Sequence, residues 1–413
     1  MTSIRQLLPT GSDVTVQDVI RSAQAAIAHP LRPGSSEARA FCTALSQRLL
    51  NDARTITFPA IQALGYWLRP AKLTPMTENY LFDPPGTQRV PAGIVFQIPP
   101  GNVATLFGYT AVIALLSGNA AVIRLSSAAN PEQELLLKLI EESLADADPS
   151  VRNRLIVVRY GHDDGITAEF SSVCDARLVW GGDETVAHIH SLPLPPLARE
   201  AGFADRFSAM ALNADRYTEL SGPDLTSLIH SAYNDIFFFD QKACSSPRFL
   251  AWIGDEAAVE QASKDFYPRL SAHAIACRYQ PGFGENVAKL NAAYLAMHDL
   301  KPRNYDVFSP ALSVITLDNL DGLPAFKRMR YGSGLLLAAR FDRLDDLAAH
   351  TERRDQTLSH WGFDPDDIQT FASGLQGRGF DRIVPAGQAP VFDAVWDGCN
   401  LFDIMTRLVQ VTP

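Results

Sequence analysis

Cysteine is scarce in this sequence, with five in 413 residues. No two of them form a CxxC pair, and an odd, widely spaced set argues against a disulfide framework and against a zinc site built from cysteines. We therefore expect a reduced, cytoplasmic protein without a metal site. The five are Cys42, Cys174, Cys244, Cys277 and Cys399.

Positive charge is also in short supply: 36 basic residues stand against 46 acidic ones, for a net charge of -10. A general nucleic-acid binder needs a basic face to displace the counterions around phosphates, so that class of protein is disfavoured. The first residues, MTSIRQLLPTGSD, lack the apolar core of about 7 to 15 residues that a secretory signal requires. With 46% apolar and 20% charged residues the chain is not disordered, and its length predicts two or three globular cores.

One long stretch has no charge at all. Residues 90–123 contain no Lys, Arg, Asp or Glu, which is the longest such run in the chain. Its IPPGN and SGN segments would interrupt a membrane-spanning helix, which needs about 20 consecutive apolar residues. We expect a buried strand, helix and strand here, and no membrane span.

Several common catalytic motifs are missing. The sequence has no GxxxxGK[ST], no complete GxGxxG, no HExxH and no GxSxG. P-loop NTPases, zincins and ordinary serine hydrolases are therefore disfavoured, and a nicotinamide cofactor would have to bind without the usual Rossmann fingerprint.

The chain alternates helix and strand patterns. Apolar residues recur at helical spacing through the first 70 residues, which predicts a helical lead-in. From residue 88 a strand, a helix and a second strand begin an alternation that predicts a doubly wound, mostly parallel sheet. A second α/β run begins near residue 225. The predicted fold is α/β with two doubly wound lobes and a helical lead-in, divided as 1–87, 88–224, 225–390 and a C-terminal helical segment over 391–413.

The segment FFFDQKACSSPR places Cys244 in a loop between a predicted helix and an apolar strand. Such a loop can hold a nucleophilic thiol at the mouth of a cleft with backbone N–H groups beside it. A small buried hydrophobe is the alternative, because no basic side chain nearby in sequence would lower the pKa of the thiol. Local chemistry leaves both open, whereas the other four cysteines fit core packing.

Two glycine or asparagine turns follow predicted strands. In IPPGN, Asn102 stands at the carboxyl edge of a parallel sheet, where open α/β folds bind ligands, or it caps the following helix. In LVWGGDETV, Gly181 and Gly182 allow a phosphate to approach a helix N-terminus, or form a plain turn. Arg124, with Ser127 in AAVIRLSS, is placed to reach a ribose or phosphate, or is a solvated strand-end arginine.

Taken in order over roughly residues 88–400, these segments resemble the aldehyde dehydrogenase superfamily and, within it, the LuxC-type acyl-CoA reductases. DQKACSSP resembles the nucleophile loop, which makes Cys244 the acylated residue, and IPPGN resembles the segment that supplies the oxyanion donor, here Asn102. VFSPALSVITLD resembles the segment that contacts the nicotinamide ribose. The resemblance places these residues beside the cofactor: Pro100, Gly101, Arg124, Ser127, Gly181, Gly182, Thr185, Asp306 and Phe308.

Two departures from the superfamily pattern bear on chemistry. The stretch GFADRFSAM lacks the glutamate that activates water in hydrolytic members, which disfavours hydrolysis of a thioester intermediate. Asp205 and Asp240 are the nearby carboxylates considered as replacements for it. A CoA thiolate leaves with little proton assistance, because the pKa of a thiol is about 8.5. Ser127 stands where NAD-specific members often have glutamate, and with Arg124 it favours the 2′-phosphate of NADPH over NADH.

The resemblance implies reduction of an acyl thioester, from acyl-CoA or an acyl-carrier protein, to an aldehyde, with NADPH as reductant and CoA as a product. The alternatives are an NAD(P)-dependent aldehyde dehydrogenase, an acyl-phosphate reductase, or a non-catalytic scaffold of the same fold. The resemblance also implies a homo-oligomer and an acyl-transferring or acyl-activating protein partner. The acyl pocket stays open: the three phenylalanines at 237–239 line it or form a buried helix end.

Overall fold

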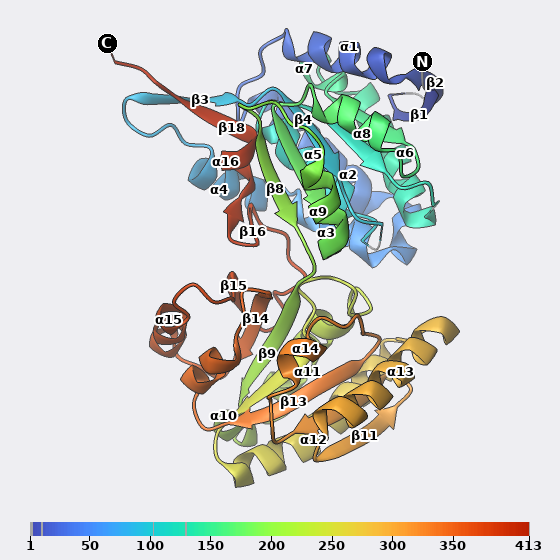
Figure 1. Cartoon of the computed structure of the whole chain (residues 1–413). Coiled ribbons are helices and arrows are strands. Elements are labelled where there is room, and N and C mark those ends of the chain that lie inside the picture. The colour runs from blue at the N-terminus through green and yellow to red at the C-terminus, as the bar shows by residue number, and fades with distance from the viewer. Residues whose placement is uncertain (1–2, 10, 102, 129, 413) are drawn as a thin grey trace. The chain divides into compact units, whose positions relative to one another are not determined.

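The computed structural model describes residues 3–9, 11–101, 103–128 and 130–412. The chain forms two compact units, the first made of Met1–Ala204 with Phe392–Pro413 and the second of Asp205–Val391 (Figure 1). Each unit has its own sheet and core, and each is described separately below.

The first unit is built on a sheet whose central part is parallel. The predicted strand, helix and strand of the uncharged run are present as β4, α5 (Leu106–Leu116) and β5, and every residue of α5 is buried. A helix that is apolar on all sides belongs inside a protein core, which explains why this run carries no charge. In the described part of the unit, the strands lie in this order: β2 (Ser12–Thr15), β1 (Ser3–Leu8), β6 (Leu155–Arg159), β5 (Ala120–Leu125), β4 (Ile94–Ile98), β7 (Ala176–Trp180) and β8 (Arg199–Phe203).

The predicted helical lead-in over 1–87 begins with strands. β1 and β2 form an antiparallel hairpin, and β1 pairs with β6, so this hairpin extends the first sheet. The helical spacing begins only at Val16, where Thr15 and Asp18 form a reciprocal capping box at the start of α1 (Val16–Ile27). Because the strands pair with β6, the lead-in belongs to the first unit and is not a separate domain.

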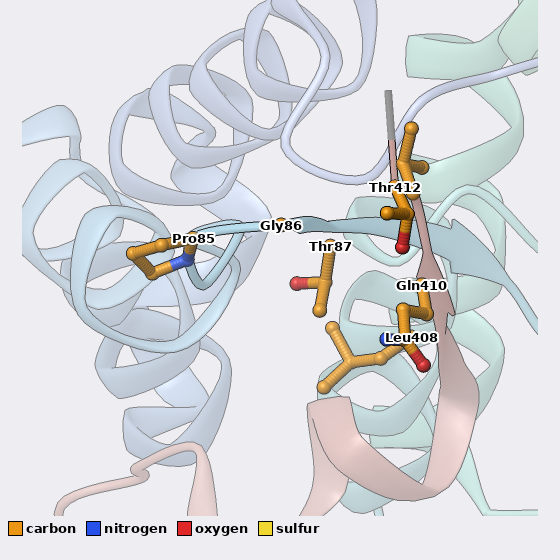
Figure 2. A pocket seen from close by; sticks show the side chains of 7 residues that line it. Pro85, Gly86, Thr87, Leu408, Gln410 and Thr412 are labelled. Atoms are coloured by element: carbon orange, nitrogen blue, oxygen red, sulfur yellow. The ribbon is translucent and has the colours of Figure 1, made fainter.

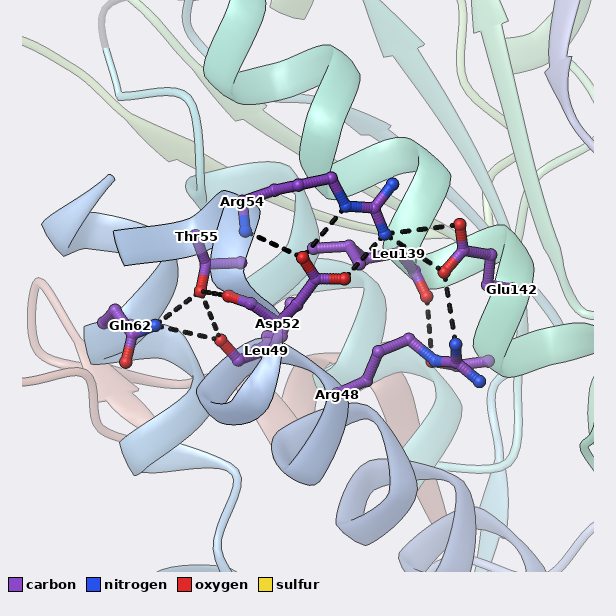
Figure 3. Close-up of polar contacts among 9 residues, drawn as sticks. Arg48, Leu49, Asp52, Arg54, Thr55, Gln62, Leu139 and Glu142 are labelled. Atoms are coloured by element: carbon purple, nitrogen blue, oxygen red, sulfur yellow. Dashed lines mark hydrogen bonds and ion pairs between the residues drawn. The ribbon is translucent and has the colours of Figure 1, made fainter. Parts of the chain in front are cut away.

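Two arginines of the other lead-in helices form polar contacts with helix α6 (Pro131–Ala145). Arg48 forms an ion pair with Glu142 at 3.1 Å, and Arg54 pairs with both Asp52 and Glu142 (Figure 3). The Arg54 guanidinium lowers the pKa of Asp52 to about 2. These helices are α2 (Ser36–Asn51), η1 (Ala53–Thr57), α3 (Pro59–Trp67) and α4 (Pro70–Tyr80), and the unit also has α7 (Pro149–Arg152), α8 (Asp164–Ser171) and α9 (Asp183–Ser191).

The C-terminal segment is helical only in part. After the short strands β16 (Val395–Trp396) and β17 (Cys399–Asn400), α16 (Leu401–Met405) ends at Thr406, and β18 (Thr406–Gln410) pairs antiparallel with β3 (Thr87–Pro91). The prediction of a helical end was therefore wrong for 406–410, whose β-branched and apolar residues pair with a strand far away in the sequence. A surface hollow beside this two-stranded ribbon is lined by residues 85–87, Leu408 and 410–412 and contains none of the predicted cofactor residues (Figure 2).

The second unit also has a mostly parallel sheet, with one antiparallel edge pair. Its first strand is β9, so the unit begins at Asp205 rather than at the expected residue 225, because β9 pairs in parallel with β10 and β14. In the described part, the strands lie in this order: β11 (Asn304–Ser309), β12 (Leu312–Leu317), β13 (Leu335–Phe341), β10 (Phe249–Ile253), β9 (Phe207–Asn213), β14 (Asp355–Trp361) and β15 (Arg382–Pro385).

Helices cover this second sheet and bury two apolar clusters against it. The predicted α/β class with two mostly parallel sheets is confirmed. None of the helices within the described ranges has the length and apolar character needed to cross a bilayer. The helices are α10 (Ala214–Thr218), α11 (Gly222–Phe237), α12 (Glu256–Ala276), α13 (Phe283–Leu300), α14 (Leu323–Phe326), η2 (Leu344–His350) and α15 (Pro365–Gly374).

Candidate functional site

The loop that carries Cys244 is held in an unusual backbone conformation. Asp240 and Gln241 follow α11 with φ angles of +54° and +56°, a region that residues other than glycine rarely adopt. The Gln241 amide compensates by bridging the loop: its Nε2 donates to the carbonyls of Pro247 (2.9 Å) and Leu335 (3.1 Å), and its Oε1 accepts from Gly334 N (2.8 Å). The loop is therefore attached to β13 on one side before it reaches Cys244.

The two carboxylates considered as replacements for the missing glutamate are both engaged in structural contacts. Asp240 accepts from the hydroxyls of Tyr279 and Ser333 and forms an ion pair with Lys242 at 2.8 Å. Asp205 forms an ion pair with Arg330 at 3.1 Å. These partners give each carboxylate a role in holding loops together, which does not favour either as a general base.

Cys244 is half-buried, and its neighbours fix both its sulfur and its backbone. The Gln356 amide nitrogen Nε2 donates to Cys244 Sγ at 3.2 Å. The Ser208 hydroxyl donates to the Cys244 carbonyl oxygen at 2.6 Å and accepts from Thr357 N at 3.2 Å. Three neighbouring strands thus meet at the cysteine, because Ser208 is on β9, Gln356 is on β14, and the cysteine loop leads into β10.

Arg248, four residues after the cysteine, supplies the basic partner that the linear sequence did not suggest. Its guanidinium lies over the rings of Phe207 (4.8 Å) and Tyr331 (5.2 Å) and donates to the carbonyls of Met329 and Arg206. Burial lowers the pKa of Arg248, while electrostatic contacts that include Tyr331 and Cys244 oppose this shift. The Arg248 guanidinium therefore interacts electrostatically with Cys244, while its hydrogen bonds go to backbone carbonyls.

The predicted cofactor residues of the first unit gather at one edge of its sheet. β5, β4 and β7 are adjacent parallel strands, so the segments that follow their carboxyl ends meet where open α/β sheets bind ligands. A Cβ at Gly101 would lie 3.6 Å from Ser126 Oγ, which shows that the turns after β4 and β5 approach each other closely. Pro100 is half-buried and Ser127 is exposed at this edge. Asn102, the predicted oxyanion donor, lies outside the described residues.

The turn after β7 leaves a helix N-terminus without a side-chain cap. Gly182 is the N-cap of α9 and offers no side chain to the free N–H groups. A Cβ at Gly181 would lie 3.1 Å from Thr185, so that turn is closely packed. Asp183 and Glu184 stand in the first turn of α9. Their negative charges oppose the attraction of the helix dipole for a phosphate.

Arg124 lies at the same edge, and part of its guanidinium already donates hydrogen bonds to backbone carbonyls. Its Nη2 donates to the carbonyls of Tyr160 (3.3 Å) and Gly161 (3.1 Å), and the guanidinium lies 5.3 Å from the Tyr160 ring centroid. Its Nε is buried and has no hydrogen-bond partner among the described residues. Burial lowers the pKa of this arginine. The side chain therefore keeps one unused donor at the carboxyl edge of β5.

Asp306 and Phe308 are on β11, at the edge of the second sheet. Asp306 is exposed and Phe308 packs near Tyr267, with 5.5 Å between ring centroids. No described contact joins either residue to Cys244. The turn after β11 approaches Gly334, a partner of Gln241, because a Cβ at that glycine would lie 1.7 Å from Ala311 O.

The three phenylalanines before the cysteine loop differ in burial. Phe237 is in the core of the second unit at 2% exposure, as a buried helix end. Phe238 and Phe239 are half-buried and contact each other edge to face at 4.9 Å. Only the latter two stay available as acyl-chain contacts.

Comparison with known proteins identifies the family of the chain. A family model described as acyl-CoA reductase (LuxC) matches residues 80–408. The chain belongs to the LuxC acyl-CoA reductase family. This confirms the resemblance drawn from DQKACSSP and IPPGN.

Curated relatives of this LuxC-family chain carry the name long-chain acyl-protein thioester reductase. One from Vibrio harveyi is 22% identical over 324 residues, which are 74% of this chain and 60% of that protein. One from Photorhabdus laumondii is 29% identical over 189 residues, or 44% of this chain and 35% of that protein. The matched regions thus span from about a third to three fifths of these relatives.

Solved structures show the fold of the LuxC-family chain. Aldehyde dehydrogenase 21 from Physcomitrella patens superposes with a TM-score of 0.69 at 12% identity, covering 96% of this chain and 90% of that one. An NAD-dependent benzaldehyde dehydrogenase from Corynebacterium glutamicum gives a TM-score of 0.67 at 13% identity, with 99% and 95% covered. The predicted aldehyde-dehydrogenase fold is confirmed.

The sequence analysis of this LuxC-family chain did not identify two residues that contact Cys244. Gln356 and Ser208 are 112 and 36 positions away from Cys244 along the chain. Each is a polar residue in an otherwise apolar predicted strand, QTLSHW and FSAMAL, and a polar side chain inside a buried strand is the signal that could have drawn attention to them.

Proposed function

We propose that this protein reduces an acyl thioester to an aldehyde through an acyl-enzyme on Cys244. The observation that carries the proposal is the placement of the Cys244 sulfur, which accepts a hydrogen bond from Gln356 Nε2 on a loop bridged by Gln241. A structural cysteine in a core is surrounded by apolar groups, whereas this one has an amide donor at its sulfur and interacts electrostatically with Arg248.

In the first step the Cys244 thiolate attacks the thioester carbonyl. The new carbon–sulfur bond forms as the π electrons move to oxygen, and collapse of this adduct expels the thiolate of the donor, as CoA or as the carrier thiol. We propose Asn102 and the Cys244 backbone N–H as donors to the oxyanion. Hydride addition to the acyl carbon then gives a hemithioacetal anion. Its carbonyl re-forms, the carbon–sulfur bond breaks, and aldehyde and thiolate are released.

A nicotinamide cofactor, when bound, supplies that hydride. Two features of the first unit fit such a group: the carboxyl edge formed by β5, β4 and β7, and the unused buried Nε of Arg124. The uncapped N-terminus of α9 lies at the same edge, but its acidic first turn disfavours a phosphate. We propose that Arg124 and Ser127 donate hydrogen bonds to the 2′-phosphate and make NADPH the preferred form.

The acyl-enzyme should hydrolyse slowly, because neither nearby carboxylate is free to act as a general base that activates water. The stretch GFADRFSAM has no glutamate, and Asp205 and Asp240 are held in ion pairs. Without a free base, attack of water on the thioester is slow, so reduction is the favoured fate of the intermediate.

The test is intact-protein mass spectrometry after incubation with a long-chain acyl-CoA or the same acyl group on a carrier protein, without cofactor. We expect one acyl adduct, located on Cys244 by peptide mapping, and its loss as aldehyde when NADPH is added. Cys277→Ala, which removes an exposed cysteine, is the matched control and should keep the adduct. Comparison of the two donors identifies the better one, and Cys244→Ala protein that reduced acyl-CoA at the parental rate would contradict the proposal.

A further inference from the structure

The strand that carries Gln356 is irregular at the point where it passes Cys244. β14 pairs with β9 in parallel, and the pairing shifts between Asp355, opposite Phe207, and Leu358, opposite Ala209. Three steps along β14 therefore correspond to two along β9, which is a β-bulge that opposes Gln356 and Thr357 to Ser208. Bulges of this kind redirect a side chain or interrupt pairing, and they are frequent beside active sites.

Because of the bulge, the consecutive residues Gln356 and Thr357 both take part in the hydrogen bonds around Cys244. In a regular strand, neighbouring side chains point to opposite faces. Here Thr357 N donates to Ser208 Oγ, which holds the Cys244 carbonyl, while Thr357 Oγ1 donates to Gln356 Oε1 at 3.3 Å. In this arrangement the amide oxygen of Gln356 faces the Thr357 hydroxyl. The amide nitrogen faces Cys244 Sγ and directs its N–H donor toward the sulfur.

We infer that Gln356 is a catalytic residue that stabilises the negative charge on Cys244 sulfur, both in the attacking thiolate and in the thiolate released when the hemithioacetal collapses. This inference rests on the proposed function for its second half. A neutral thiol or thioester sulfur is a weak acceptor, whereas a thiolate is a strong one, so a fixed N–H donor favours the charged form. The amide neither gains nor loses a proton, and the electron pair of the breaking carbon–sulfur bond returns to sulfur under the same hydrogen bond.

Burial makes this contact strong. Gln356 is 2% exposed and Thr357 is fully buried, so the amide is held among protein groups and does not exchange its partners with bulk water. Arg248 adds a positive field, but its own hydrogen bonds go to backbone carbonyls. Among the contacts described for the sulfur, the amide is the directional one.

Thiol alkylation tests the inference without substrate or cofactor. The full-length protein is treated with iodoacetamide across a pH series, and the rate at Cys244 is followed by peptide mass, with Cys244→Ser as the blank. Gln356→Glu keeps the shape but replaces the donor with an acceptor, and Gln356→Met removes all polarity at similar volume. We expect the half-maximal pH of alkylation to rise by about one unit in both variants, which lowers the rate at neutral pH about tenfold.

A matched control makes the same amide-to-carboxylate change elsewhere. Gln133 on α6 is buried and belongs to the first unit, whereas Cys244 belongs to the second, so Gln133→Glu should leave the alkylation profile at its parental position. If Gln356→Glu fails to fold, Gln356→Met still decides. An unchanged profile in folded Gln356→Met would overturn the inference. A shifted profile in a protein that accepts no acyl group would overturn the proposed function and leave the thiolate contact standing.

Turnover supplies the second readout. With an acyl donor and cofactor, loss of the amide should slow acylation and aldehyde release by about tenfold each while the KM for the cofactor stays at its parental value. A change confined to KM would mean that Gln356 only shapes the substrate site, and it would overturn the catalytic assignment.

Discussion

Lys327 and Asp355 form an ion pair, with 2.6 Å between Nζ and Oδ2, and their side chains are only 4% and 1% exposed. Asp355 also accepts from Glu352 N at 2.7 Å, and Lys327 donates to His350 O at 2.8 Å. The pair joins α14 to the first residue of β14, one position before Gln356. A buried ion pair of this kind therefore fixes the start of the strand that supplies the amide to Cys244.

Removing the lysine should destabilise the second unit strongly. Lys327→Met leaves Asp355 without its cation in a buried place, and the expected loss in the free energy of unfolding is about 3–5 kcal/mol. Urea denaturation measures it. Arg328→Met, which removes the neighbouring exposed arginine, should change stability by less than about 0.5 kcal/mol. Equal losses in the two variants would show that the pair contributes no more than a surface charge.

Asp235 should make stability depend on pH. It accepts from Gly387 N at 2.8 Å and Ala389 N at 2.9 Å, and burial raises its pKa to about 6 despite these bonds. The folded protein therefore keeps a proton that the unfolded chain has lost above about pH 4, so stability falls as pH rises toward and through 6. Asp235→Asn removes this titration.

The comparison of parent and Asp235→Asn isolates the effect. Between about pH 5 and about pH 7.5 the parent should lose roughly 1–2 kcal/mol of unfolding free energy relative to the variant. Urea melts of both proteins at a series of pH values measure the difference. A constant difference across the series would mean that the carboxyl titrates in the same range whether the chain is folded or unfolded.

Gly334 should tolerate no side chain. Its φ is +82°, its N–H donates to Gln241, and a Cβ there would lie 1.7 Å from Ala311 O and 2.8 Å from the Ala311 carbonyl carbon. Gly334→Ala should cost more than about 2 kcal/mol in unfolding free energy, and it should slow alkylation of Cys244 by displacing the Gln241 bridge. Chemical denaturation and the iodoacetamide rate are the two measurements.

Gly377 is a control position at which an alanine would meet the backbone strain but not the close contact. Its φ of +84° is nearly the same, and a Cβ there would meet nothing within 4 Å. Gly377→Ala should therefore cost only the conformational penalty of about 1–2 kcal/mol and leave the alkylation rate unchanged. If both alanine variants behaved alike, the approach of Ala311 to Gly334 would have no energetic consequence.

The central architecture could be predicted from sequence because it depends on local patterns. The uncharged run, IPPGN and the glycine pair each combine a strand signal with a turn signal, and α/β alternation then determines which edge they share. The β1–β2 hairpin and β18 were missed because their pairing depends on partners far along the chain, such as β6 and β3.

A residue of the candidate site could be predicted only where a single segment of the sequence identifies it. Cys244 could be selected because its loop has a recognisable local sequence. The contact from Gln356 required a bulge in β14, and a register shift between two strands leaves no local pattern in either one. Arg248 was close in sequence, yet its placement against Phe207 and Tyr331 depends on β9 and on the segment before β13.

Arg124 should set the choice between the two nicotinamide cofactors. Its buried Nε has no partner among the described residues, and Nη2 is held by the carbonyls of Tyr160 and Gly161, so the guanidinium is fixed at the carboxyl edge of β5. If it contacts the 2′-phosphate, Arg124→Met should weaken NADPH binding about tenfold and NADH binding much less, since the lost contact is charge-assisted. Fluorescence titration of the reduced cofactors measures both affinities. Arg152→Met, which removes an exposed arginine of the same unit, controls for net charge. Equal weakening of NADPH and NADH would assign Arg124 to the part of the cofactor that the two share, and the preference for NADPH would then have to come from Ser127 or from another residue.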